Sequence, residues 1–293
     1  MLVLILVLWW FDPSTVGLHE FYGARLARCY LGASQAAATE NRVSVERPDD
    51  VMPLEEDSGL PIHLVCCAAN QFWGEPLSTL HRGARSAVLS RFGIALGDHW
   101  IADPKLRLSS AMTASGAAFD SLMGELSLTL GRAVPFVMTA LNLRLGLWVR
   151  NPAGCGNRGQ GKIWFPGQFF LREMIGWAQC RPDRKNAGTY MHLSDGGHFE
   201  NLALYELIRR HCRYIIVSDA GEDRDFAFTD FGRATRRVRE DFGVEIEIDL
   251  SPLRPGADGY SEQHVAVVTW FKGQNTRMVR ILDGSQTAVQ VIQ

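Results

Sequence analysis

The sequence predicts an α/β fold in which helices flank a mainly parallel sheet. The 293 residues are 46% hydrophobic and 21% charged, which is typical of a soluble globular protein. A chain of this length can form one large domain or two small ones. Its last third alternates between short apolar runs, typical of buried strands, and longer segments with helical spacing. This strand–helix–strand order favours a parallel sheet covered by helices.

The chain opens with an uncharged apolar run, Met1–Phe11. A helix that crosses a bilayer needs about 20 apolar residues, so this run is too short. It also lacks the basic residues that begin a signal peptide. Two interpretations stay open: a buried or interfacial segment, or the end of a membrane helix that starts upstream. Trp9 and Trp10 before Asp12 favour the second. We therefore assign residues 1–13 as the remnant of a membrane helix and expect membrane association.

Apolar spacing and caps place the elements that follow. We expect a helix over 16–31, a solvated acidic loop over 33–60, a strand over 62–67, a helix over 133–148 and another helix after Pro166. In the last third, we expect strands at 189–193, 214–217, 244–250, 265–271 and 278–282, and helices at 201–212 and 231–242.

Charge and cysteine content exclude several classes of protein. The 30 basic and 32 acidic residues give a net charge of -2, so the chain is not expected to bind nucleic acid. The six cysteines include no C-x-x-C pair, which excludes a zinc ribbon and a thioredoxin-like motif. Scattered cysteines fit a reduced compartment, so we expect the cytoplasmic side of the membrane.

The segment Gly154–Lys162 contains spacings that resemble phosphate-binding loops. A dinucleotide-binding loop follows a strand, whereas we expect a helix before this segment. A P-loop needs Ser or Thr after its lysine, and Ile163 stands there. A glycine-rich surface loop is therefore favoured, and a phosphate or nucleotide binder stays as an alternative.

Charged side chains gather in two further places. His192, Asp195, His198 and Glu200 have the residue types of metal ligands, but the glycines between them break any shared helix, so no metal is expected. No cofactor is expected either. The arginines of the predicted helix 231–242 are interpreted as a solvated face; they are Arg233, Arg236, Arg237 and Arg239.

The most informative stretch is Asp195-Gly196-Gly197, at the end of a predicted strand. Glycines at such a point permit a tight turn and the close approach of another segment or a ligand. Ligands of open α/β sheets bind at the carboxyl ends of strands. The alternative is that Asp195 only caps a helix that begins near Glu200.

The residues around this turn carry a resemblance. His192–Leu202, followed by Tyr205–Arg210, resembles the C-terminal half of large bacterial patatin-like phospholipases. Further segments agree with that family in the same order along most of residues 16–283. They are 18–26, 115–118, 123–124, 141–146, 148–152, 214–220, 241–243 and 261–264.

The resemblance implies a lipid acyl hydrolase with a Ser-Asp dyad and a three-layer patatin-like sandwich. Asp195 would be the base that takes the serine proton, and Gly196 and Gly197 would form its supporting turn. The substrate would be a lipid or phospholipid. The family's nucleophile lies in G-x-S-x-G, which this sequence lacks. Ser115 has Thr113 where the first glycine is required, so we do not expect it to be the nucleophile.

These points predict that residues 14–293 are the C-terminal portion of such a domain, N-terminally truncated or completed by an upstream chain that carries the serine. Alone, this chain is expected to be inactive. The main rival is a non-catalytic, membrane-anchored scaffold or subunit with the patatin-like fold.

Overall fold

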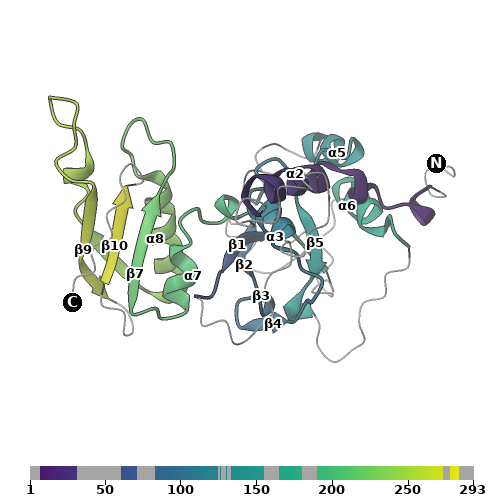
Figure 1. The fold of residues 1–293 in the computed structure, drawn as a ribbon, viewed down its shortest axis with the longest axis horizontal. Coiled ribbons are helices and arrows are strands. Elements are labelled where there is room, and N and C mark those ends of the chain that lie inside the picture. The colour runs from purple at the N-terminus through teal and green to yellow at the C-terminus, as the bar shows by residue number, and fades with distance from the viewer. Residues whose placement is uncertain are drawn as a thin grey trace, which may run out of the picture. The chain divides into compact units, whose positions relative to one another are not determined.

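The computed structural model divides into two compact units, residues 1–199 and 200–293, each described here by itself (Figure 1). The residues that the structure describes are 7–31, 61–70, 83–124, 126, 130, 133–154, 165–179, 190–272 and 278–283. The predicted loop over 33–60 lies outside them.

The first unit is built on a six-stranded sheet with the order β4-β3-β2-β1-β6-β5. The strands are β1 (Val65–Asn70), β2 (Ala84–Ser90), β3 (Gly93–Leu96), β4 (His99–Ile101), β5 (Leu147–Arg150) and β6 (Tyr190–Asp195). All five pairings between them are antiparallel. The predicted three-layer sandwich around a mainly parallel sheet is therefore wrong for this unit.

Short turns explain the antiparallel order. Arg91 and Phe92 alone separate β2 from β3, and Gly97 and Asp98 alone separate β3 from β4. Connections this short join only antiparallel strands, because a parallel pair needs a crossover of a dozen or more residues. Gly97 has a φ of +59°, a conformation that glycine adopts at little cost.

Helices cover this sheet and supply part of its core. They are α2 (Leu18–Leu26), α3 (Leu108–Ser115), α5 (Ala133–Ala140) and α6 (Gln168–Gln179), with one-turn segments at Pro13–Val16, Pro152–Gly154 and Gly196–His198, and a π-helical segment at Ala27–Leu31. Ala111 and Ala114 of α3 pack with Cys67, Leu89 and Leu193 in the buried core. Small residues on α3 thus allow the helix to lie close to the strands β1 and β6.

The predicted helix over 133–148 is half as long as expected. It ends at Ala140, and Leu147–Arg150 forms the edge strand β5. Asn142 has a φ of 54°, in the left-handed region that stops a helix. Gly146 lies against the ring of His192, where a side chain would collide. The apolar spacing of the sequence continues past Asn142 and Gly146, but the helix ends before them.

The second unit has a four-stranded sheet with the order β7-β10-β9-β8. Its strands are β7 (Tyr214–Asp219), β8 (Glu245–Ile248), β9 (Val265–Lys272) and β10 (Met278–Asp283), and its helices are α7 (Leu204–Arg209), α8 (Thr229–Phe242) and the turn Ser251–Leu253. Only β10 and β7 pair in parallel. The predicted elements are confirmed here within a few residues, whereas their mainly parallel arrangement is wrong.

The N-terminal residues that the structure describes are packed against the first unit. Residues 7–10 are helical, and Leu8 is buried beside Gly167. The Trp9 ring stacks on Phe165 with ring centroids 5.5 Å apart. In the described part of the chain, no helix is long and apolar enough to span a membrane.

Candidate functional site

Asp195 is the last residue of β6, opposite Cys67 of β1. Its side chain is half-buried, and its Oδ1 accepts a hydrogen bond of 2.7 Å from the backbone N–H of Gly197. Within the described ranges, we find no hydrogen bond to the other carboxylate oxygen. The carboxylate is therefore held by one oxygen while the other can accept a proton.

The position after Asp195, Gly196, has no room for a side chain. A Cβ at Gly196 would lie 2.8 Å from the carbonyl oxygen of Cys66. Real Cβ atoms do not approach backbone oxygens so closely, so any other residue would push the turn away from β1. Gly197 contributes the N–H that binds Asp195. The predicted supporting roles of both glycines thus have a geometric basis.

The sequence left open whether Asp195 only caps the helix that begins near Glu200. In the structure, Asp195 and Glu200 bind different backbone N–H groups. Asp195 caps only the one-turn segment Gly196–His198. Near α7, the Glu200 carboxylate accepts hydrogen bonds from the N–H groups of Leu202 and Tyr205. Asp195 is therefore not the cap of α7.

Ser115 lies close to the Asp195 turn, although the sequence argument set it aside. It ends α3, and its Oγ donates a hydrogen bond of 2.7 Å to the Cys66 carbonyl that Gly196 also approaches. The Asp195 N–H faces Ala117 O at 3.4 Å. The carboxyl end of a helix carries a negative partial charge, which disfavours an oxyanion beside Ser115.

The opposite side of β6 carries a polar network that sequence reasoning missed. Ser194 Oγ accepts a hydrogen bond of 2.8 Å from Asn70 Nδ2 and lies 2.9 Å from His198 Nδ1. Asn70 also binds Leu122 O and the N–H of Gly124. Ser194 is fully buried, and the network anchors residues 194 and 198 on either side of the Asp195 turn.

A buried ionisable cluster lies further along the same face of β6. His192 Nδ1 is 3.3 Å from Asp120 Oδ2, and both side chains are fully buried. Burial raises the pKa of Asp120 well above its usual value and lowers the pKa of His192 to about 4. Burial therefore favours the uncharged form of each group.

Glu173 of α6 forms the charged part of this cluster. It is fully buried, forms an ion pair with Arg144, and accepts hydrogen bonds from Ser121 and from Thr139 at 2.8 Å. Burial opposes its ionisation, but Arg144 and these hydroxyls lower its pKa below the usual value. A buried pair that keeps its charges needs such partners, so this cluster links α6 to α5 and to the irregular segments that carry Ser121 and Arg144.

The structure separates the four residues considered as metal ligands. His192 pairs with Asp120, Asp195 binds Gly197, His198 meets Ser194, and Glu200 binds the start of α7. Among the residues described, no group of three or more His, Cys, Asp or Glu side chains could hold a metal ion.

Two further predictions need correction. Arg237 of α8 is 1% exposed, so the arginines of this helix do not form one solvated face. The strand β5, not a helix, precedes the Gly154–Lys162 segment. Residues 155–162 of that segment lie outside the described residues, so the structure does not test the phosphate-binding alternative.

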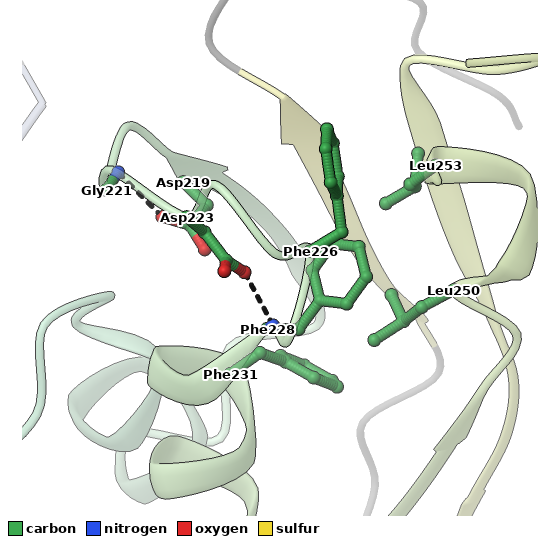
Figure 2. Close-up of a pocket in the computed structure, with 8 residues that line it drawn as sticks. All are labelled: Asp219, Gly221, Asp223, Phe226, Phe228, Phe231, Leu250 and Leu253. Atoms are coloured by element: carbon green, nitrogen blue, oxygen red, sulfur yellow. Dashed lines mark hydrogen bonds between the residues drawn. The ribbon is translucent and has the colours of Figure 1, made fainter. Parts of the chain in front are cut away.

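A small cavity of about 90 Å³ lies in the second unit, with none of the predicted site residues in its lining (Figure 2). Its apolar side chains are Phe226, Phe228, Phe231, Leu250 and Leu253. At its rim, Asp219 accepts from Gly221 N and Asp223 accepts from Phe228 N, at 2.9 and 2.6 Å. The cavity is far smaller than the roughly 300–1,000 Å³ of typical ligand pockets.

Comparisons with known proteins do not identify the chain. No protein-family model matches it, and no curated protein sequence matches it.

Proposed function

We propose that this chain carries the base of an acyl-ester hydrolase that acts on lipids, with Asp195 as the base. The observation that carries the proposal is the Asp195 carboxylate at the end of β6, which the Gly197 N–H holds by one oxygen while no described residue is hydrogen-bonded to the other. A base must be fixed in position and must keep a lone pair for the proton of its nucleophile. The resemblance around residues 192–202 supplies the reaction class.

The serine of the proposed dyad comes from a polypeptide segment outside these 293 residues. No G-x-S-x-G occurs in the sequence, and the Ser115 hydroxyl donates its hydrogen bond to the backbone carbonyl of Cys66 rather than to a carboxylate or an imidazole. A carboxylate without a nucleophile does not catalyse acyl transfer. The chain alone therefore binds no covalent acyl group, and its partner is a segment that brings an activated serine to Asp195.

Two assays test this function. The purified chain is incubated with a short p-nitrophenyl ester and with phospholipid vesicles, first alone and then joined to the polypeptide encoded immediately upstream of Met1. We expect background hydrolysis from the chain alone and turnover from the joined protein. Hydrolysis by the chain alone that disappears in Ser115→Ala would overturn the proposal, and so would an inactive joined protein that is folded.

A further inference from the structure

A groove of about 510 Å³ in the second unit lies between the strand β8 and the helix α8. One wall is formed by residues 244–247, at the start of β8. The other wall is one side of α8, which is formed by Gly232, Thr235, Arg236 and Arg239. Both walls are about 10 Å long, because a helix rises roughly 1.5 Å and a strand roughly 3.3 Å per residue. The groove therefore has the length of about four residues of extended chain.

The path of the chain explains why this β8–α8 groove is open. α8 ends at Phe242, and Gly243 has a φ of +63°, the left-handed conformation in which glycine ends many helices. β8 begins at Glu245, so this short connection makes the strand return along the helix. A Cβ at Gly232 would meet nothing within 4 Å. Space therefore remains on the helix wall beside the strand.

The strand wall of the groove is a sheet edge. β8 is the last strand in the order β7-β10-β9-β8 and pairs with β9 on one side. In the described part of the chain, no strand pairs with its other edge. Alternate N–H and C=O groups of an edge strand point away from the sheet, where a further strand can bind them. An extended peptide backbone matches their spacing, so the edge favours a polypeptide as the occupant of the groove.

The side chains of β8 alternate between the two sides of the sheet. Ile246 is half-buried against the core that contains α8, whereas Glu245 and Glu247 are exposed. A strand added beside β8 would alternate in the same way. Its side chains on the helix side would meet Arg236 and Arg239, and those on the other side would lie beside the glutamates.

The arginines of the helix wall can bind a carboxylate of the occupant. The Arg236 side chain is 53% exposed, and its Nε is 4.0 Å from Glu240 Oε1. An exposed pair at this distance contributes little, so Arg236 can turn toward a stronger partner. Arg239 is exposed as well. The helix side of the groove thus favours an acidic side chain, which two guanidinium groups can approach.

Charge also distinguishes between possible strands. Antiparallel pairing of β8 with β8 of a second copy would bring the glutamates of both strands onto one face, and like charges in facing positions destabilise a sheet. The last ten residues of this chain, 284–293, carry no charged side chain. A segment of another protein with basic residues on the outer side would instead pair with Glu245.

We propose that the β8–α8 groove binds an extended segment of a partner protein as an additional strand, with an acidic side chain toward Arg236 and Arg239 and basic side chains beside Glu245. The backbone of the segment extends the sheet, and the alternation of its charges selects it. This inference does not depend on Asp195 or on hydrolysis, because the whole groove lies within the second unit.

Fluorescence anisotropy with labelled, capped peptides tests the proposal. The probe is Lys-Val-Lys-Glu-Lys-Val-Lys, in which valine and glutamate share one side of an extended chain and the lysines share the other. We expect it to bind at least about tenfold more tightly than Lys-Lys-Val-Val-Glu-Lys-Lys, which has the same composition without the alternation.

N-methylation shows whether the peptide binds as a strand, because it removes backbone donors from one edge at a time. Methyl groups on the valine and glutamate nitrogens block one edge, and methyl groups on the internal lysine nitrogens block the other. We expect one of these two peptides to lose affinity by about tenfold or more and the other to keep it. Equal effects of the two methylations would overturn the proposal.

Variants of the chain locate the binding site. Gly232→Leu fills the groove with a good helix former and should weaken binding by about tenfold or more. Arg236→Glu/Arg239→Glu should weaken it similarly, because the new carboxylates repel the glutamate of the probe. The matched control Arg213→Glu/Arg224→Glu makes the same change on exposed arginines that do not line the groove, and should leave binding unchanged.

Hydrogen exchange of the unmodified chain gives a readout that needs no variant. The alternating peptide should slow amide exchange at 244–248 and leave β7, at the opposite edge of the same sheet, unchanged. Slowed exchange in β7 alone, equal affinity for the two peptide orders, or no binding of either peptide would overturn the proposal. So would a protein joined to its upstream segment in which that segment already prevents the peptide from binding.

Discussion

At the scale of single residues, the Asp195 turn depends on the absence of a side chain at Gly196. Gly196→Ala should lower the free energy of unfolding by roughly 1–3 kcal/mol, because its Cβ would lie 2.8 Å from Cys66 O. Urea unfolding followed by circular dichroism measures this change.

The control is a second glycine with open space around it. Gly232 lies in α8, and a Cβ there meets nothing within 4 Å. Gly232→Ala should leave the protein equally stable or stabilise it by up to about 1 kcal/mol. Equal effects at the two positions would show that Gly196 is not constrained by β1.

The buried Asp120–His192 pair makes a prediction about pH. The folded pKa of His192 is about 4, below its ordinary value of 6.5, so the unfolded chain binds more protons there between these pH values. That group alone makes stability fall as pH drops from 6.5 to 4. Asp120 acts in the opposite sense, because its raised pKa keeps a proton in the folded state that the unfolded state has lost. The two groups therefore act in opposite directions on the pH dependence of the wild type's stability.

Asp120→Asn should expose the histidine's contribution. The amide cannot titrate, so between pH 4 and 6.5 the variant's stability should rise with pH more steeply than the wild type's, by up to about 1.4 kcal/mol per pH unit. Other groups that influence His192 are Glu173, Arg144 and His19, which both proteins share. Chemical denaturation at several pH values gives the two slopes, and parallel slopes would contradict a raised pKa for Asp120 in the folded protein.

Sequence reasoning identified the Asp195 turn but not the hydrogen-bond network that holds the residues on either side of it. Asp-Gly-Gly at a strand end is a local pattern, and local patterns are visible in the chain. The Asn70–Ser194–His198 network joins residues 124 positions apart in its longest bond, so only the folded sheet brings them together. A spacing of four between Ser194 and His198 was the one available signal.

At the scale of elements, α7 depends on a carboxylate that precedes it. Glu200→Ala should cost about 1 kcal/mol, because the N–H groups of Leu202 and Tyr205 lose their acceptor. Thermal unfolding measures the loss. The comparison variant Glu222→Ala removes an exposed partner of Arg224 and should change stability by less than about 0.5 kcal/mol. A Glu200 effect no larger than this would refute the capping role.

Strands and helices were easier to predict than their pairing. The runs at 214–217 and 265–271 are continuous and apolar, and they were placed within two residues. Whether two strands pair in parallel or antiparallel depends on the length and structure of the connection between them. In the described residues, no α-helix lies between β8 and β9 or between β9 and β10. The two hairpins of residues 84–101 were not predicted. The Arg91-Phe92 turn carries no hairpin signal, whereas the Gly97-Asp98 pair is a hairpin signal that the sequence reasoning overlooked.

At the scale of the whole molecule, the chain has two separate hydrophobic cores. One joins β1, β2 and β6 to α3, and the other joins β7 to α7 and α8. Asp195 and its turn belong to the first unit. The base proposed for hydrolysis is thus carried by the unit that contains the antiparallel six-stranded sheet.

The central claim is that Asp195 is a base, and one substitution tests it most directly. Asp195→Asn is made in a protein that joins this chain to the serine-bearing segment that the proposed function requires, and the rate of ester hydrolysis and the melting temperature are measured beside the wild type. Asparagine can still accept the Gly197 N–H through its Oδ1 but cannot take a proton. We predict an unchanged melting temperature with hydrolysis reduced by about 100-fold or more. Near-normal hydrolysis with a lowered melting temperature would contradict the account.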